Sequence, residues 1–417
     1  LTPLLVVLCL VAACGDDEGD PAETGDAPTS TSTSTEESTT STTAAAPALP
    51  EGVTAVAGDD AEALFAAVPD PVPPGEHGDL LAVQELDPGD LPASRVVRVL
   101  YRSESIAGQP IAVSGVIAIP EAPAPEDGRD VLTWAHGTTG IADVCAPSIE
   151  GAAAVAPGRP FLEAGITVVA TDYEGLGTPG RHPYVAGVSE GRGTLDIVRA
   201  ARQLEGGPVS QVLIWGHSQG GHAALFANQI AAEWTPELDI AGTVAGAPPS
   251  QLTLIAQALQ GGPFQYYILM AGAGWAEAFG ADLSLVATPR ALELVPRVDE
   301  VCAGDLADVF NDIPPEELLA ADPATVEPWA SLLVENDPNH AVGSSPILII
   351  HGGNDEQIPV ASSELLLGQL CELGQVVERR VYEGESHAGV IAPSFDDMFS
   401  WMHDRLTGVE PVPTSCG

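Results

Sequence analysis

One serine of the chain stands in a pattern that suits nucleophilic chemistry. Residues 216–220, GHSQG, match G-x-S-x-G; a strand-like apolar run precedes them and a helix-like run of small residues follows. A sharp strand-to-helix turn exposes the serine hydroxyl, and the glycines two positions before and after it remove Cβ clashes. This context predicts that Ser218 attacks a carbonyl carbon.

A second stretch, GVSEG at residues 187–191, matches the same pattern. It follows a loop rich in glycine and proline rather than a strand. Ser189 is therefore better placed to cap the helix that starts near it. The sequence favours Ser218 over Ser189 as the nucleophile.

A serine hydroxyl is a weak nucleophile at neutral pH and needs a base, which in turn needs an acid to orient it. Asp355 follows an apolar strand-like run at 347–350, and His387 follows the last expected strand, at 377–382. Loops beyond the carboxyl ends of parallel strands meet at one edge of a sheet, where sites form. We therefore predict Asp355 as the acid and His387 as the base, with Glu356 as the rival acid.

The other histidines have structural interpretations. His136 and His351 begin glycine turns and brace them, His217 and His222 flank the nucleophile and pack there, and His403 lies inside a terminal helix.

Attack on a carbonyl creates an oxyanion that backbone N–H groups must stabilise. One donor is expected from the residue after the nucleophile, Gln219. The second is expected from the loop WAHGTTG at residues 134–140. Thr138 is the first choice there, and Thr139 is the alternative.

The elements that must position these residues alternate between strand and helix. Strands are expected at 95–101 and 111–119, joined by a turn at 108–110. Buried strands are expected at 131–135, 166–170, 212–215, 240–245 and 347–350, and a last strand is expected at 377–382. Helices are expected at 189–204, 220–233, 360–371 and 395–406. This alternation predicts an α/β fold with a mostly parallel central sheet and helices on both faces.

Residues 249–345 interrupt the alternation with helix formers, including an apolar piece at 264–270. We interpret this insertion as a mostly helical cap over the site, with ordinary core helix as the alternative.

Six cysteines are present, and four of them lie beyond the N-terminal region: Cys145, Cys302, Cys371 and Cys416. An even number outside the cytoplasm favours disulfides, and four cysteines allow three connectivities. Their spacing, with or without histidines, does not suit zinc, so no metal or organic cofactor is expected.

Taken together, several motifs resemble those of the secretory lipase family, which has a capped α/β-hydrolase fold and includes a fungal lipase A. They are HGTTG (136–140), DVCAPS (143–148), TDYEGLG (171–177), GHSQGG (216–221) and GGND (352–355) before Ile358-Pro359. The resemblance implies the triad Ser218, Asp355 and His387, a helical cap and lipase or esterase activity. It also implies the disulfides Cys145–Cys302 and Cys371–Cys416.

The N-terminal region predicts an export signal and an anchor. Residues 1–13 are nearly all apolar and end in VAA before Cys14, which resembles a bacterial lipoprotein signal; a differently cleaved secretory signal or a buried strand is the alternative. Lipid-modified Cys14 would begin a Ser/Thr-rich tether at 14–50, too poor in apolar residues to fold. The hydrolase domain would then span 51–417, outside the cytoplasm.

The chain carries 59 acidic residues against 14 basic ones, all arginine, for a formal charge of −45. Such a chain repels nucleic acid and anionic lipid headgroups, so both are poor partners. The predicted triad and the resemblance favour an ester or lipid substrate, cleaved through an acyl-serine intermediate. An extracellular acyltransferase with the same triad and a non-catalytic tethered binding protein are the alternatives.

Overall fold

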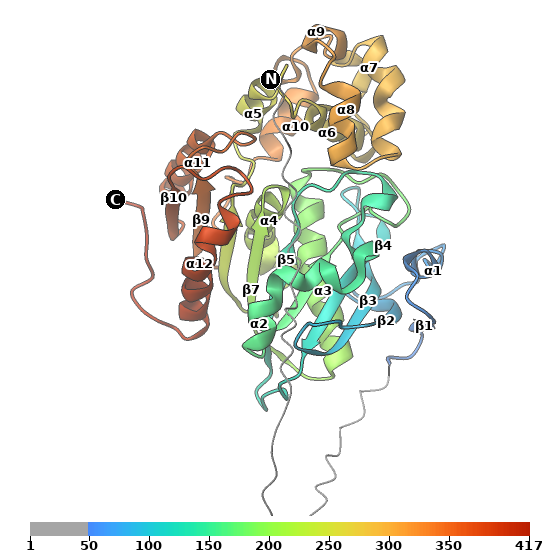
Figure 1. Ribbon diagram of the computed structural model, residues 1–417, viewed down its shortest axis with the longest axis vertical. Helices are drawn as coiled ribbons and strands as arrows, with labels where there is room; N and C mark the ends of the chain where they lie inside the picture. Colours follow the sequence, from blue (N-terminus) through green and yellow to red (C-terminus); the bar gives the residue numbers. More distant parts are fainter. Residues whose placement is uncertain (1–48) are drawn as a thin grey trace, which may run out of the picture. The chain divides into compact units, whose positions relative to one another are not determined.

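A ten-stranded sheet forms the centre of the protein, seen in a computed structural model that describes residues 49–417 (Figure 1). The signal, Cys14 and most of the tether lie outside the described residues. The strands, in chain order, are β1 (Thr54–Val56), β2 (Leu80–Leu86), β3 (Ala93–Glu104), β4 (Pro110–Pro120), β5 (Arg129–Ala135), β6 (Thr167–Thr171), β7 (Val209–His217), β8 (Ile240–Gly246), β9 (Ile347–Gly352) and β10 (Val377–Tyr382).

In space the strands follow the order β1-β2-β3-β4-β6-β5-β7-β8-β9-β10. From β6 to β10 all neighbours are parallel, whereas β2, β3 and β4 pair antiparallel, as do β4 and β6. The central strands are buried apolar runs, as a sheet covered on both faces requires. Their carboxyl ends meet at one edge, which is where the candidate residues were expected.

Helices cover both faces of this sheet, which confirms the predicted fold class. On one face, α3 (Gly187–Glu205), α4 (Gln219–Trp234) and α11 (Val360–Leu373) pack against β5, β7 and β9. On the other face, the 3₁₀ segment η2 (Pro147–Gly158), α2 (Arg159–Glu163) and α12 (Ile391–Leu406) pack against the same strands through Phe161 and Trp401.

The insertion between β8 and β9 forms a helical cap above the carboxyl ends of the strands (Figure 1). It contains α5 (Leu252–Ala258), α6 (Tyr266–Ala278), the 3₁₀ turns η3 (Leu283–Leu285), η4 (Val295–Asp299) and η5 (Pro323–Thr325), and α7 (Pro289–Leu294), α8 (Ala303–Phe310), α9 (Pro315–Leu318) and α10 (Trp329–Glu335). The cap has its own apolar core, centred on Met270, Leu306 and Phe310. The apolar piece at 264–270 is partly core helix as well, so both interpretations of it apply.

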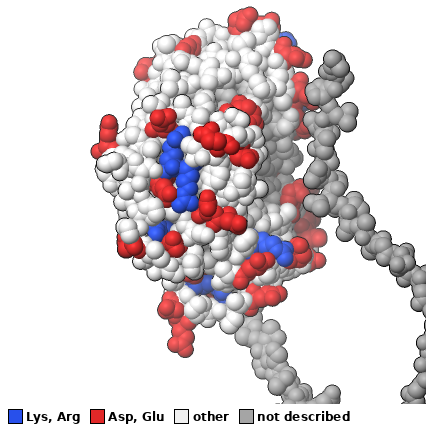
Figure 2. All heavy atoms as spheres, turned by 60° about the vertical axis from the view of Figure 1, so that its left-hand side comes forward, with Lys and Arg blue, Asp and Glu red and all other residues white. Residues whose placement is uncertain are grey.

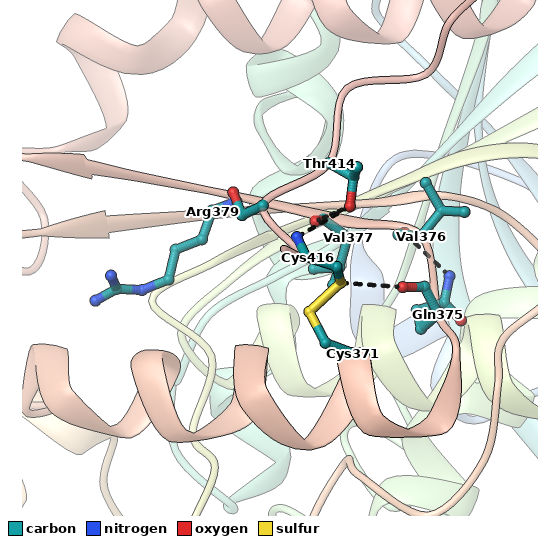
Figure 3. Close-up of a disulfide and its surroundings, with 8 residues drawn as sticks. Cys371, Gln375, Val376, Val377, Arg379, Thr414 and Cys416 are labelled. Carbon is teal, nitrogen blue, oxygen red and sulfur yellow. Dashed lines mark hydrogen bonds between the residues drawn. A yellow bond between two sulfur atoms is a disulfide. The ribbon is translucent and has the colours of Figure 1, made fainter.

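Both disulfides implied by the resemblance form in the structure. Cys145, at the end of the 3₁₀ turn η1 (Asp143–Cys145), pairs with Cys302, the residue before α8. Cys371 of α11 pairs with Cys416, and Figure 3 shows the C-terminal tail held beside β10 there. The first disulfide joins the loop after β5 to the cap, whereas the second holds the tail.

Several elements have no counterpart in the sequence-based predictions. β1, β2, α1 (Ala61–Phe65) and η2 were not expected. β1 and α1 are short, and η2 contains glycines and prolines. The prediction that Ser189 caps a helix is wrong. Helix α3 begins two residues earlier, at Gly187, with Ala186 as its N-cap residue. The Ser189 hydroxyl donates to the carboxylate of Glu174 instead.

The surface is acidic, as the composition requires. Figure 2 shows acidic side chains spread over one face, with the few arginines lying among them. Several arginines form ion pairs, such as Arg199 with Glu237. Within the described residues, every helix is too short or too polar to cross a lipid bilayer.

Candidate active site

Ser218 occupies the sharp turn between β7 and α4. Its backbone has φ 59° and ψ −124°, a conformation that side-chain-bearing residues rarely adopt and that clusters at functional sites. A Cβ on Gly216 would lie 2.0 Å from the carbonyl oxygen of Gly220, and one on Gly220 would lie 1.9 Å from that of Ala135. Only glycine fits at both positions, for the reason that the motif suggested.

Asp355 and His387 meet beyond the ends of β9 and β10. The His387 Nδ1–H group donates to Asp355 Oδ2 over 2.7 Å. The other carboxylate oxygen accepts the backbone N–H groups of Gln357 and Ile358 at 2.9 and 2.8 Å. The Asp355 side chain is fully buried, so these contacts fix both its position and the orientation of the imidazole.

His351, at the end of β9, is a third partner of this carboxylate. Its Nε2 lies 3.2 Å from Asp355 Oδ2 and 3.0 Å from the carbonyl oxygen of Ile358. Burial raises the pKa of Asp355, but hydrogen bonds from His351 and His387 outweigh it and hold that pKa well below its ordinary value. The acid therefore stays ionised at neutral pH. From the sequence, His351 was expected only to brace a glycine turn.

Glu356, the rival acid, has a different role. Its carboxylate accepts the backbone N–H of His387 over 3.1 Å, whereas the imidazole points to Asp355. Glu356 therefore holds the loop that carries His387.

Ser218 and His387 line the same cleft, which has a volume of about 720 Å³. The ring of His217 packs against that of His387 with 4.8 Å between centroids. Burial, followed by the neighbouring His387, lowers the pKa of His217 to about 3, so this ring is neutral. Among the described residues, the Ser218 hydroxyl makes no hydrogen bond to His387. Such contacts often tighten only when substrate binds.

The loop after β5 lies directly against the Ser218 turn. A Cβ on Gly137 would lie 3.2 Å from the His217 carbonyl oxygen, so glycine permits the close approach. The Thr138 hydroxyl shares a 2.7 Å hydrogen bond with the hydroxyl of Tyr184, and the Thr139 carbonyl accepts the N–H of Ala303 from the cap.

The backbone N–H groups of Thr138 and Gln219 are available for an oxyanion. Within the described part of the chain, neither has a protein acceptor. Both residues belong to segments that border the cleft, and Thr138 lines it. Thr139 also lines the cleft, and its backbone N–H likewise has no protein acceptor among the described residues. Thr138 and Thr139 therefore both remain candidates for the second oxyanion donor.

The remaining histidines agree with their predicted roles except one. His136 Nδ1 lies 2.7 Å from the Gly137 carbonyl oxygen and braces that turn, and His403 lies within α12. His222 does more than pack: it lies between the Glu190 carboxylate and the carbonyl of Asn336. In the part of the chain that the structure describes, His, Cys, Asp and Glu side chains nowhere gather in threes suited to a metal ion.

The strained serine and the His387–Asp355 pair lie on an α/β-hydrolase fold. The sequence model of the family described as "Secretory lipase" matches residues 155–414. The chain therefore belongs to the secretory lipase family.

Individual relatives show the same likeness. Lipase A of Arthroderma benhamiae is 27% identical over 353 residues, which is 77% of this chain and 72% of that protein. A Mycobacterium tuberculosis protein described as a probable inactive lipase is 25% identical over 75% of this chain and 73% of its own length. The closed-state structure of Candida antarctica lipase A superposes with a TM-score of 0.72 at 20% identity, covering 84% of this chain and 87% of that one, which shows the shared fold.

Proposed function

We propose that the protein hydrolyses carboxylic esters through an acyl-serine intermediate, with Ser218 as nucleophile, His387 as base and Asp355 as acid. The single observation that carries the proposal is the 2.7 Å contact between His387 and a buried, ionised Asp355, beside a strained Ser218 in the same cleft. A binding protein has no use for a strained serine beside an oriented imidazole.

In the proposed reaction, His387 takes the proton of the Ser218 hydroxyl as its oxygen attacks the ester carbonyl carbon. The N–H groups of Gln219 and Thr138 stabilise the oxyanion. His387 then gives the proton to the departing alcohol, which leaves an acyl-serine. A water molecule activated by the same imidazole releases the acid and restores Ser218.

The relative from Mycobacterium tuberculosis makes activity a necessary test, because membership of the family does not guarantee turnover. The test combines p-nitrophenyl ester hydrolysis with fluorophosphonate labelling. We expect the wild-type protein to turn over esters and to be labelled at Ser218. Ser218→Ala should lose about 10⁶-fold in kcat and keep its melting curve. Wild-type protein that neither hydrolyses nor labels would support the non-catalytic alternative.

The matched relatives are described as lipases, which favours water rather than an alcohol as the acceptor of the acyl group. The acyltransferase alternative predicts that added alcohols divert most of the acyl-enzyme into new esters. Product analysis with and without glycerol or a sugar acceptor separates the two reactions.

We propose an apolar acyl chain for the substrate. Tyr267 borders both the cleft and a smaller, almost wholly apolar cavity of about 70 Å³ between the cap and the core, lined also by Leu252, Trp275 and Ile358. The Tyr267 hydroxyl donates to the side chain of Gln357 over 3.0 Å, beside the Asp355 loop. A series of esters with increasing chain length would measure how much of this apolar space the acyl chain uses.

We further propose that the protein is attached to the outer face of a bacterial membrane through lipid on Cys14. The support for the lipid anchor comes from the sequence of residues 1–50. The two disulfides support only a location in an oxidising compartment.

A further inference from the structure

The side chain of Gln219 is buried in a polar cluster behind the nucleophile. Its Nε2 lies 2.8 Å from Glu190 Oε1 and 2.8 Å from His182 Nε2. All three side chains are almost completely buried. Burying so many polar groups is costly unless each donor finds an acceptor, so the cluster has a defined arrangement of protons.

The positions of the protons in this cluster can be assigned by starting from His182. His182 Nδ1 lies 2.8 Å from the carbonyl oxygen of Glu174, so Nδ1 donates there. Burial lowers the pKa of His182 to about 4, so the ring is neutral and its Nε2 accepts. The Gln219 amide therefore donates both its hydrogens, one to His182 and one to Glu190.

This assignment leaves one orientation for the amide. Gln219 Oε1 is buried and has no hydrogen-bond partner among the described residues. Turning the amide over would bring this oxygen against the Glu190 carboxylate, which is repulsive, and would remove both donors. Glu190 and His182 together therefore fix the Gln219 side chain.

Glu190 is the centre of the cluster. Its Oε1 also accepts the backbone N–H of Val185 over 2.9 Å, and its Oε2 lies 3.0 Å from His222 Nδ1. Val185 has φ 59°, a strained value for a β-branched residue, which the carboxylate helps to hold. Glu190 lies in the first turn of α3, where the helix dipole favours a negative charge.

The cluster also reaches the cap. His222 Nε2 donates to the carbonyl oxygen of Asn336, just after α10, and the Asn336 side chain accepts the N–H of Gly187 at the start of α3. Glu190 is thus linked on one side to the nucleophile turn and on the other to the cap.

We propose that Glu190 is a positioning residue for the oxyanion donor: by holding the Gln219 side chain, it fixes the backbone N–H of Gln219 toward the developing oxyanion. The inference rests on the proposed function, because it needs an ester carbonyl at Ser218. Gln219 directly follows the strained Ser218, so anchoring the Gln219 side chain restrains the backbone that carries the peptide bond between them. The second G-x-S-x-G stretch, 187–191, thus contributes through its glutamate rather than its serine.

The test uses variants that separate position from stability. Glu190→Ala removes the acceptor, whereas Glu190→Gln keeps an oxygen for Gln219 and gives His222 an N–H. Asp196→Ala is the matched control, since Asp196 is an equally buried carboxylate on the same helix that contacts Ser103 and Trp234 instead. Gln219→Ala and the double variant Glu190→Ala/Gln219→Ala complete a mutant cycle.

Three quantities are measured on folded protein: kcat and KM for a p-nitrophenyl ester, and the inhibition constant of a trifluoromethyl ketone. The ketone forms a tetrahedral oxyanion on the serine, so its affinity reports the oxyanion site. We expect Glu190→Ala to lower kcat about tenfold or more with little change in KM, and to weaken the ketone by a similar factor. Glu190→Gln should restore most of both, and Asp196→Ala should change stability alone.

In the Gln219→Ala background, Glu190→Ala should cost less than about twofold in kcat, because the side chain through which it acts is gone. Undiminished kcat and ketone affinity in Glu190→Ala would overturn the inference, as would equal losses in Asp196→Ala or fully additive losses in the double variant. Failure of the wild-type protein to hydrolyse esters is a different outcome, which overturns the proposed function itself.

Discussion

Removing the Cys145–Cys302 disulfide should weaken catalysis as well as stability, because this disulfide supports the loop that carries Thr138. The backbone of Gly140 lies so close to it that an added Cβ would be 2.7 Å from Cys145 Sγ and 3.1 Å from the Cα of Cys302. The residue after Cys302, Ala303, donates its N–H to the Thr139 carbonyl over 2.9 Å. The loop is therefore held between the Ser218 turn and the cap.

The stability part of the effect follows from the lengths of the closed loops. The disulfide partners are 157 residues apart for Cys145–Cys302 and 45 residues apart for Cys371–Cys416. The chain-entropy relation gives a stabilisation of about 5 kcal/mol for the first and about 4 kcal/mol for the second. The two disulfides therefore differ by only about 1 kcal/mol in this respect, so removal of the second is a close control for stability.

Their positions relative to the cleft differ much more. Cys145 and Cys302 both line the cleft, whereas the Cys371–Cys416 pair joins the C-terminal tail to α11 beside β10 (Figure 3). We expect the double variant Cys145→Ser/Cys302→Ser to lose about tenfold or more in kcat. This is part of the loss in kcat that removal of a whole oxyanion donor causes. The double serine variant at 371 and 416 should keep its kcat when folded.

The assay is ester turnover at a temperature where circular dichroism shows each variant folded, with denaturant midpoints measured alongside. Two results would refute the reasoning: an unchanged kcat in the 145/302 variant, or equal losses of kcat in both variants. The first would mean that the contacts with Ser218 and Ala303 hold the loop without the disulfide. The second would mean that the loss of kcat is a general effect of removing a disulfide.

Three further predictions concern separate parts of the chain. His351→Ala should lower kcat/KM about tenfold, the worth of a hydrogen bond to a charged group, and raise the pKa of Asp355 toward its ordinary value; an unchanged kcat/KM would contradict a supporting role. Burial raises the pKa of Asp196 to about 7, so the folded protein holds a proton there that the unfolded chain loses above pH 4, and stability falls as pH rises from 4 to 7. Asp196→Asn should remove up to about 4 kcal/mol of that fall in the free energy of unfolding, measured by denaturant unfolding at pH 4.5 and 7.5. A variant whose stability falls with pH as steeply as that of the wild type would refute the prediction. Cys14→Ser should release the protein into the medium, and immunoblots of membrane and medium that show it still on the membrane would contradict lipidation.

The candidate triad could be proposed from the sequence because each of its members lies in the turn or loop after an expected strand. Ser218, Asp355 and His387 need only local signals and the rule that parallel strands end at one edge of the sheet. No such signal marks His351 or Glu190. Their roles depend on partners in other parts of the fold, and their flanking glycines suggested a turn and a false nucleophile motif instead.

Ser189 shows that a clear local signal can also predict the wrong contact. A serine near a helix start predicts a cap, since the local backbone N–H groups need an acceptor. In the structure the hydroxyl donates to Glu174, fifteen residues earlier in the chain, and the helix starts without a side-chain cap. A partner that distant in sequence overrides local preference, and only the folded chain reveals it.

The way the cap is held determines where a substrate can enter. Cap residues bond to the core around the site at several points: Tyr267 to Gln357, Ala303 to Thr139, Asn336 to His222 and Asp299 to Arg181. The Cys145–Cys302 disulfide adds a covalent link. A rigid swing of the whole cap would break all these contacts at once and pull on the loop that carries Thr138.

The cleft already offers another way in. Its wall along η1 and η2 includes Val144 and Ile149, which are 65% and 37% exposed. If the proposed ester substrate crosses this rim to Ser218, the cap can stay in place and the proposed oxyanion donors keep their positions. Opening would then be needed only between Tyr267 and its apolar neighbours in the cap and the core, where an acyl chain would displace side chains rather than helices.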